Sequence, residues 1–478
     1  MKGQISSGSI DTSKAGAFAF KRGGNAIDAL IAAQLAAHVC EPLLTGFGGA
    51  GIGMVRFQGK VYNVDMFTTM PGSIPCLNPD QRKVALDFGT TTQHFVIGEG
   101  TIAVPTIPQG LHQLHQRFGR LPLELLAKPA IQLARSGFEV GTACGYLLNL
   151  LMPIIKQSDS LSKWFTKSEV PLKQGERCQV PEHENDIHHF IEYGDQFFQH
   201  GIYEDFINSL HNSFLSEKDI ENYTVIIEKK QLHNKRYRFF LPKYPSIGGR
   251  VLKQAVSTRS NSPIAYTHTA NLLTKAYQTT INQLTNTIKR NIGQTTHIST
   301  IDDEGNCAAL TTSLGETSGI VVPDSGVILN NFLGEDDVVH PLLESQVGKR
   351  LLTMCTPMIF ESSTTNDIWV LGSGGSNRIP GAIFQTLQQL LFGQSLEQAI
   401  LHPRIHPVFN QQNELASILT EDLGQADIET LQVQFPNVAM KHFPDRNLYF
   451  GGVHVVGMQN GKLVGMGDPR RNGYAIGV

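Results

Sequence analysis

The spacing of hydrophobic residues changes near residue 295, so that the chain has a helix-rich first part and a strand-rich second part. The clearest element of the first part is the Ala-rich run over 26–40, which ends at Glu41-Pro42. Apolar residues lie on every side of this segment, and a proline disfavours helical backbone in the residue before it. The pattern therefore predicts a helix that is buried all round.

The rest of the first part is also mainly helical by its spacing. Apolar residues recur every three or four positions over 107–136, up to Gly137, which predicts two helices. The more polar stretch 145–245 also favours helices. A Ser/Thr/Asn/Gln-rich segment over 250–294 is predicted to hold one helix, over 265–284, and an exposed linker.

Residues after 295 alternate between apolar and polar types and are interrupted by glycine turns, which is typical of antiparallel strands. Strand pairs are predicted over 296–314, 319–331 and 451–469, and a strand over 367–376 leads into a helix over 382–392. An earlier hairpin over 53–67 turns at Gln58-Gly59. Helices combined with a large antiparallel strand set indicate the α+β class.

The composition of the chain excludes several classes of protein. The 478 residues carry 41% hydrophobic side chains, 17% charged side chains and a net charge of −3. This composition argues against an intrinsically disordered chain. The chain also has no run of basic residues that would indicate nucleic-acid binding. Six scattered cysteines lack zinc spacing, so no metal site is expected. No apolar run is long enough to cross a bilayer, and the first residues lack a signal peptide, so we expect a cytoplasmic protein, or a periplasmic or secreted one if an upstream signal is missing.

Two glycine-rich segments are candidates for ligand contact. Gly46–Gly51 matches the dinucleotide fingerprint in letters, but it follows a helix and precedes a strand, so close backbone packing is the favoured interpretation. Residues 372–375 lie between a strand and a helix, where backbone N–H groups can point at an anion. A plain turn, an oxyanion hole and a phosphate loop all remain open for this segment from its residues alone.

Two other candidates have polar side chains. His183, His188 and His189 lie close together on a polar helix, which favours a solvated face over a metal site. Thr295 stands where the polar linker meets the first strand of the second part. A threonine at a chain start can act as a nucleophile with its own α-amine as general base, which here requires a cut between Gln294 and Thr295.

Blocks along nearly the whole chain resemble the gamma-glutamyltranspeptidase (gamma-glutamyltransferase) family of N-terminal-nucleophile hydrolases. The matching blocks are KRGGNAIDALIAAQLA (21–36), EPLLTGFGGAG (41–51), the segment 104–140, FLSEKDIENY (214–223), PSIGG (245–249), QTTHISTIDDEGN (294–306), SGIVVPDSGVILNN (318–331), LGSGGSNRI (371–379) and GDPRRNG (467–473).

This resemblance implies a fold and a maturation step. The fold is an αββα sandwich, two antiparallel sheets between helix layers. The maturation step is self-cleavage between Gln294 and Thr295 into a large subunit, 1–294, and a small subunit, 295–478, which form one intertwined fold.

The resemblance also implies catalytic roles. Thr295 would be the self-cleaving residue and the nucleophile that forms an acyl-enzyme. Ser313 stands where the family has a second, supporting hydroxyl, more usually a threonine. Gly374 and Gly375 match the oxyanion-hole glycines, so the resemblance favours that interpretation of the loop. No cofactor is implied.

Departures from the family pattern concern substrate recognition. Phe67 replaces the arginine of the Asp-x-Arg-Glu-x-x-Pro motif that binds the glutamyl carboxylate. Leu352-Thr353 replaces a Ser-Ser pair, which leaves Thr353 as a candidate contact. Glu335, or Asp336 in its place, would supply an acid for the substrate amine. The chain thus resembles a divergent subgroup that lacks the glutamate-binding arginine.

These features predict a self-processing gamma-glutamyltransferase or glutathione hydrolase-like enzyme that acts on a small-molecule amide, nominally a glutathione-like gamma-glutamyl amide. An acylase that acts on a different amide is the first alternative. The second is an uncleaved, inactive family member with a binding role. No nucleic-acid or membrane partner is expected.

Overall fold

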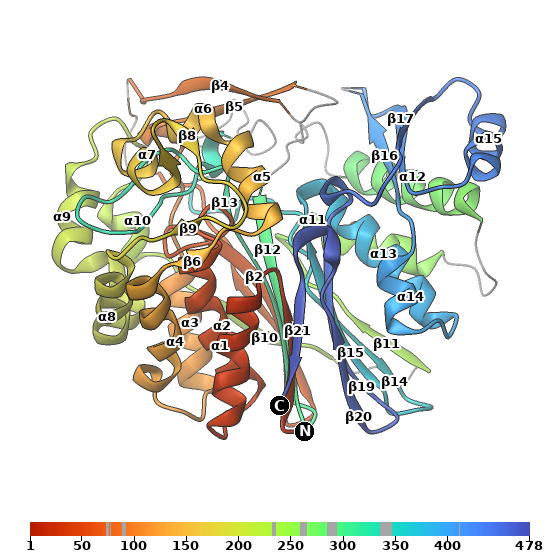
Figure 1. The fold of residues 1–478 in the computed structure, drawn as a ribbon, viewed down its shortest axis with the longest axis horizontal. Coiled ribbons are helices and arrows are strands. Elements are labelled where there is room, and N and C mark those ends of the chain that lie inside the picture. The colour runs from red at the N-terminus through yellow and green to blue at the C-terminus, as the bar shows by residue number, and fades with distance from the viewer. Residues whose placement is uncertain are drawn as a thin grey trace.

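Two antiparallel sheets lie face to face between two layers of helices, as Figure 1 shows. The computed structural model describes residues 1–72, 76, 78–87, 92–231, 236–258, 265–283, 294–334, 347–410 and 412–478. The larger sheet has seven strands in the order β10 (Ile226–Lys229), β3 (Lys60–Met66), β2 (Ala50–Phe57), β13 (Cys307–Gly315), β12 (Gln294–Asp302), β1 (Gly3–Ser7) and β21 (Tyr474–Gly477). The five-stranded sheet has the order β11 (Tyr237–Phe240), β14 (Met358–Ser362), β15 (Ile368–Gly374), β19 (Gly452–Gln459) and β20 (Lys462–Met466). The predicted α+β class and αββα layering are confirmed.

One helix layer covers the outer face of the seven-stranded sheet. It contains α1 (Ile10–Lys21), α2 (Ala26–Cys40), α3 (Ile107–Phe118), α4 (Leu123–Ser136) and α8 (His183–Tyr193). All residues of α2 are buried, because β12 and β13 lie against one side of it and α1 and α4 against the others. Asn25 and Asp28 form a capping box at its start, so the predicted bounds 26–40 are confirmed.

The other helix layer covers the five-stranded sheet. Its members are α11 (Ile247–Ser257), α12 (Tyr266–Asn282), α13 (Ile379–Leu391) and α14 (Leu396–Leu401). Helix α13 begins at Ile379 rather than at 382, because Pro380 is accommodated in its first turn. The smaller helices α5 (Thr142–Leu150), α6 (Met152–Ile155), α7 (Asp159–Phe165), α9 (Gly201–Ser209) and α10 (Glu217–Glu221) lie at the top and left of Figure 1.

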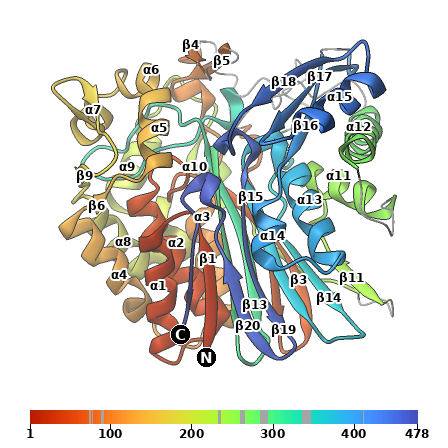
Figure 2. The same cartoon turned by 45° about the vertical axis from the view of Figure 1, so that its right-hand side comes forward.

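The remaining strands form small sheets. These are three two-stranded sheets: β4 (Arg82–Asp87) with β5 (Thr92–Ile97), β6 (Phe138–Glu139) with β9 (Arg177–Cys178), and β7 (Thr166–Lys167) with β8 (Val170–Pro171). A three-stranded sheet of β16 (Ile405–Phe409), β17 (Leu415–Glu421) and β18 (Ala439–Phe443) carries α15 (Gln425–Gln434) and lies beside α12 in Figure 2.

The predicted strand pair over 319–331 is confirmed only in part. Its two arms share backbone hydrogen bonds, from Val322 N to Val327 O and from Leu329 N to Ile320 O, both at 3.0 Å. The pairing reaches only isolated bridges, between Val321 and Ile328 and between Leu329 and Gly48. Pro323 removes a backbone donor, which limits the length of the ladder.

Close backbone packing explains the glycines of 46–51, as expected. A Cβ on Gly48 would meet the backbone carbonyl of Ile328, and a Cβ on Gly49 would meet that of Ser313. In the described residues, no helix has the length and apolar character needed to span a bilayer.

Segments 1–294 and 295–478 are interleaved within both sheets. Strands β12, β13 and β21 lie beside β1, β2 and β3 in the large sheet, and β11 extends the sheet formed by β14, β15, β19 and β20. The two chain ends also pair, since Val478 N donates to Gly3 O at 2.9 Å. A cut between 294 and 295 would therefore leave both pieces held in common sheets.

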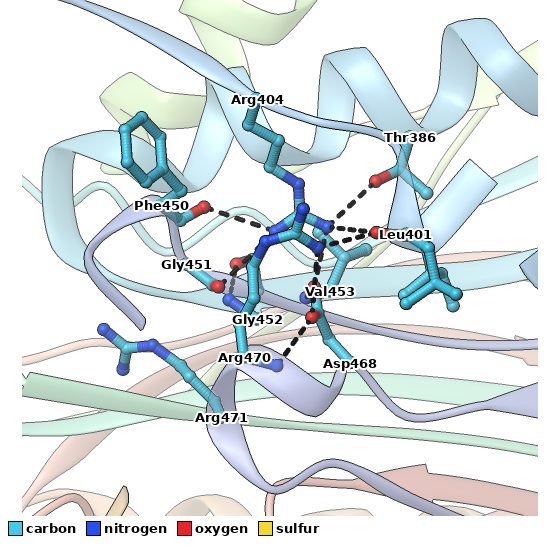
Figure 3. A network of polar contacts seen from close by, with 12 residues as sticks. Thr386, Leu401, Arg404, Phe450, Gly451, Gly452, Val453, Asp468, Arg470 and Arg471 are labelled. Carbon is cyan, nitrogen blue, oxygen red and sulfur yellow. Dashed lines mark hydrogen bonds and ion pairs between the residues drawn. The ribbon is translucent and has the colours of Figure 1, made fainter. Parts of the chain in front are cut away.

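Buried charges attach the three-stranded sheet to the rest of the molecule (Figure 3). Arg404, just before β16, pairs with Asp468 at 2.6 Å, with exposures of 1% and 0% for the two side chains. Arg470 contacts Asp468 at 3.3 Å and Glu421, the last residue of β17, at 2.7 Å. Burial alone would raise the pKa of Asp468, but Arg404 and Arg470 hold it below its usual value.

We predict that Arg404→Met lowers the free energy of unfolding by about 3–5 kcal/mol, because it leaves a buried carboxylate short of its partner. Chemical denaturation measures this loss. Arg120→Met is the matched control, since Arg120 pairs with Glu304 at the surface and its removal should cost under about 1 kcal/mol. Equal effects of the two substitutions would contradict the prediction.

Candidate active site at the start of β12

The candidate nucleophile Thr295 lies at the start of a strand that is buried on both faces. All nine residues of β12 are buried, and successive side chains point alternately to opposite faces. Thr296 and Thr300 face α2, with Thr300 Oγ1 donating to Ala26 O at 2.8 Å. Thr295 and His297 face the five-stranded sheet. The strand therefore presents Thr295 to the glycine loop that follows β15.

This glycine loop donates a backbone hydrogen bond to the Thr295 hydroxyl. The N–H of Gly375 lies 2.8 Å from Thr295 Oγ1. Gly375 has φ 121°, which L side chains rarely adopt, and a Cβ on Gly374 would collide with the Thr295 carbonyl oxygen. Both glycines are therefore needed for the loop to approach β12 this closely. Of the interpretations open from the sequence, this N–H direction favours the oxyanion hole.

The peptide bond between Gln294 and Thr295 lies at an irregular point of the strand pairing, and its carbonyl oxygen accepts a side-chain hydrogen bond. The register of β12 against β13 shifts between these two residues. The hydroxyl of Ser313 donates to the carbonyl oxygen of Gln294 at 2.6 Å and accepts from Gly315 N at 2.9 Å. The structure thus brings together Gln294, Thr295, Ser313 and the two glycines.

A cavity of about 840 Å³ opens beside this group. Thr295, Thr296 and Gly374 line one wall, and Glu41 and the α5 residue Cys144 line others. A substrate of moderate size fits such a volume. In the described residues, no cluster of His, Cys, Asp or Glu has the geometry to hold a metal ion.

Arg471 is a cavity residue to which the sequence analysis assigned no role. A Cβ on Gly374 would lie 3.2 Å from its Nη1, and a Cβ on Gly375 would lie 3.5 Å from its Nη2. Burial and the positive charge of Arg378 lower the pKa of Arg471 to about 9, so it stays charged at neutral pH. Within the part of the chain that the structure describes, Arg471 forms no ion pair. The only available signal was the double arginine of GDPRRNG.

The buried network described above fixes the direction of Arg471. Arg471 ends the short helix η7 (Pro469–Arg471), and the residue before it is held by Glu421 and Asp468. In Figure 3 the Arg471 side chain points away from that network. The two neighbouring arginines therefore differ. Arg470 pairs with two buried acids, whereas Arg471 lines the cavity and its Nε donates to Leu448 O at 3.3 Å.

The region where the resemblance expects a carboxylate-binding arginine is apolar. Phe67 is buried among hydrophobic side chains, and its ring lies 5.2 Å from that of Phe332. Asp65, the acid of the same motif, pairs with Arg350 at 2.9 Å, and that guanidinium also lies 4.4 Å from the ring of Tyr223.

The other predicted substrate contacts are not joined to the Thr295 group by any described contact. The Thr353 hydroxyl accepts from Cys355 N at 3.1 Å within its own segment. Glu335 and Asp336 lie outside the described residues. All three remain predictions.

The solvated-face interpretation of the histidine cluster is wrong for His183. Its side chain is buried and lies 3.0 Å from Asp186, whose carboxylate also accepts from Tyr203 and from Gly326 N. His188, by contrast, is 57% exposed. The helix places His183 and Asp186 on its buried face, so this pair belongs to the core.

Comparisons with known proteins place the whole chain among enzymes of one family. The family model described as Gamma-glutamyltranspeptidase matches residues 12–284 and 242–478. The glutathione hydrolase proenzyme of Bacillus subtilis (strain 168) is 26% identical, over 98% of this chain and 90% of that protein. The acylase ACY 1 proenzyme of Pseudomonas sp. (strain V22) is 25% identical, over 98% and 92%.

A solved structure extends the similarity to the fold. The cephalosporin acylase from Bacillus halodurans superimposes with a TM-score of 0.81 at 19% identity, over 99% of this chain and 95% of that one. This likeness confirms the expected N-terminal-nucleophile hydrolase fold.

We predict that Gly374→Ala lowers the free energy of unfolding by about 1–3 kcal/mol, because the added methyl must displace the Thr295 carbonyl. Gly381→Ala, in the first turn of α13, is the control. A Cβ there meets its nearest neighbour at 3.6 Å, so the change should be neutral or stabilising by about 0.5–1 kcal/mol. Thermal or chemical denaturation of both variants measures the difference, and a Gly374 variant as stable as the wild type would contradict the packing described here.

Proposed function

Because the chain belongs to the gamma-glutamyltranspeptidase family, we propose that it is a self-processing amide acyltransferase whose nucleophile is Thr295. The coarser class, an N-terminal-nucleophile enzyme of acyltransferase or acylase type, follows from the family and the fold. The observation that carries the finer proposal is the hydrogen bond from Gly375 N–H to Thr295 Oγ1, at the edge of a cavity.

Self-cleavage comes first in this proposal. Thr295 Oγ attacks the carbonyl carbon of Gln294, the C–N bond breaks, and the acyl group moves to Oγ as an ester while the nitrogen takes the hydroxyl proton. Water then hydrolyses the ester, which gives a Gln294 carboxylate and a free Thr295 with an α-amine. The Ser313 hydroxyl, 2.6 Å from the Gln294 oxygen, is suited to stabilise the negative charge on that oxygen.

Turnover uses the same hydroxyl. The α-amine of Thr295, with an ordinary pKa near 7.7–8.0, takes the Oγ proton as the hydroxyl attacks a substrate amide. The N–H groups at Gly374 and Gly375 would stabilise the tetrahedral oxyanion. The α-ammonium of Thr295 gives this proton to the leaving nitrogen as the C–N bond breaks, and water or an amino acid then resolves the acyl-enzyme. The pieces 1–294 and 295–478 would stay together as large and small subunits because their strands are interleaved.

The substrate is an amide with an anionic group, in our proposal. Arg471 offers a positive charge beside the glycine loop, and a buried guanidinium binds carboxylates well. A glutathione-like gamma-glutamyl amide meets this requirement, and one of the relatives is a glutathione hydrolase. Glu335, Asp336 and Thr353 remain the proposed contacts for the rest of such a substrate.

An acylase that acts on a different amide is the second candidate. Phe67 favours it, because this residue fills the expected place of the carboxylate-binding arginine with buried hydrophobic surface. An acylase is also among the relatives. Arg471 is compatible with both candidates. The two candidate functions therefore differ in the acyl group that the enzyme would accept.

We predict that the purified protein converts on incubation into two fragments, the smaller of about 20 kDa and beginning at Thr295. Intact mass, a denaturing gel and N-terminal sequencing measure this. Thr295→Ala should remain a single 52.5 kDa chain, and Thr295→Ser should still be cut, because it keeps a hydroxyl. A wild-type chain that stays whole would contradict self-processing and would favour the inactive binding protein.

We predict that Arg471→Met raises KM about ten- to a hundredfold for an anilide whose acyl chain ends in a carboxylate, because a charged hydrogen bond is lost. The KM for the matched neutral anilide should change less than about threefold. Arg177→Met is the control, because Arg177 lines the same cavity but donates to the carbonyls of Ser136 and Gly137. Parallel losses on both anilides would show that Arg471 does not select the anion.

A further inference from the structure

A buried carboxylate lies against the residue that follows Thr295. The hydroxyl of Thr296 donates to Glu41 Oε2 at 2.5 Å, and the hydroxyl of Thr12 donates to Oε1 at 2.6 Å. Glu41 is 7% exposed. Each carboxylate oxygen therefore has a neutral hydroxyl partner, one from β12 and one from α1.

Glu41 lacks the cation that a buried carboxylate usually has. It takes part in no ion pair within the described ranges, and burial raises its pKa. Burying an acid costs free energy unless hydrogen bonds or an opposite charge offset it, and for Glu41 the two hydroxyls supply the hydrogen bonds. Glu41 and Thr296 both line the cavity that Thr295 also lines.

Helix α2 holds Glu41 rigidly. Its backbone N–H donates to Ala37 O at 2.8 Å, and its carbonyl accepts from Leu44 N at 2.9 Å and from Thr45 N. Because the helix is buried on all sides, the carboxylate has a fixed position. A hydrogen bond to it therefore fixes Thr296 relative to the helix layer and not only relative to the neighbouring strands.

We infer that Glu41 and Thr296 are positioning residues that hold the start of β12, and with it Thr295, in place both before and after the chain is cut. The expected effect on catalysis rests on the proposed self-cleavage. Before the cut, Gln294 continues the strand on the other side of Thr295. After the cut, Thr295 is a chain end beside a point where the strand register is irregular. The Thr296 hydroxyl then ties the residue next to that end to the other subunit.

The inferred effect concerns the chemical step. A misplaced nucleophile reduces the rate at which a bound amide is attacked, whereas Arg471 and the rest of the cavity remain available for binding. Loss of the Thr296 hydroxyl should therefore lower kcat and leave KM nearly unchanged.

Thr296→Val tests the inference, because valine keeps the shape and strand preference of threonine and removes only the hydroxyl. We expect kcat to fall about ten- to a hundredfold, with KM changed less than about threefold. Thr296→Ser should restore most of the activity. Amide hydrogen exchange over 295–298 should be about tenfold faster in Thr296→Val than in the wild type.

Thr300→Val is the matched control. Thr300 lies on the same strand and face, and its hydroxyl donates to Ala26 O at the other end of the same helix. Its loss removes the same kind of contact four residues further from Thr295. We expect it to lower stability without changing kcat or the exchange over 295–298.

A double-mutant cycle identifies the partner. If Thr296 acts through Glu41, then Thr296→Val combined with Glu41→Met should lower kcat no further than Glu41→Met alone. Additive losses would overturn the pairing. Equal kcat and equal exchange in Thr296→Val and Thr300→Val would overturn the positioning role.

Failure of the proposed function gives a different result. If the wild type remains uncut and inactive, the proposed self-processing fails, and the exchange experiment still decides the positioning role in the uncut chain. Faster exchange over 295–298 in Thr296→Val than in Thr300→Val then supports it, and equal exchange overturns it.

Discussion

The central strand β12 is covered on both faces, and this constraint shapes the whole candidate site. A buried polar side chain needs hydrogen-bond partners, and β12 carries many buried polar side chains. The side chains that face α2 bond to Glu41 and to the Ala26 carbonyl, whereas those that face the five-stranded sheet meet the glycine loop and a buried histidine network. Satisfying these groups fixes the strand on both sides, so its first residues are held where a reactive hydroxyl is useful.

The glycines at this site have one physical function, close approach of backbone to backbone. Gly374 and Gly375 allow the loop after β15 to reach the Thr295 hydroxyl, and Gly49 allows the segment after α2 to lie on the Ser313 carbonyl. A side chain at any of these places would separate the two sheets or the strand from the helix layer. The same closeness leaves a backbone N–H, rather than a side chain, as the donor nearest the proposed nucleophile.

Much of the fold could be predicted from local patterns. The Ala-rich run defined α2 to the residue, and the turns at Gln58-Gly59 and Asn460-Gly461 defined hairpins, because each signal is complete within a few positions. The segment 319–331 looked like strands, and its two arms do share backbone hydrogen bonds, but the pairing is limited to isolated bridges. His183 looked solvated, because the polar residues around it hide that its Nδ1 lies 3.0 Å from Asp186 inside the core, where Tyr203 also donates to Asp186.

The candidate site divides in the same way. Thr295, Ser313 and the glycine loop could be proposed from short motifs, and the structure brings them together. Glu41 and Thr296 are 255 positions apart, so their hydrogen bond depends on how α2 packs on β12, which no local pattern contains. The sequence does not distinguish the roles of Arg470 and Arg471. Only the packing of the fold shows that Arg470 is the one that pairs with the buried acids Glu421 and Asp468.

In the proposed function, substrate recognition depends on where a positive charge lies near Thr295. At Phe67, where the family resemblance leads us to expect an arginine, the chain has apolar surface that packs on Phe332, so a carboxylate there would lose its hydration without a partner. The acid beside it, Asp65, is already neutralised by Arg350. Beside the glycine loop, the reverse holds, since Arg471 is charged, largely buried and without an acidic partner among the described residues. An anionic substrate would therefore gain on the Arg471 side of Thr295 and lose on the Phe67 side. In the proposed mechanism, this asymmetry would select the orientation of the acyl group, whichever amide is the substrate.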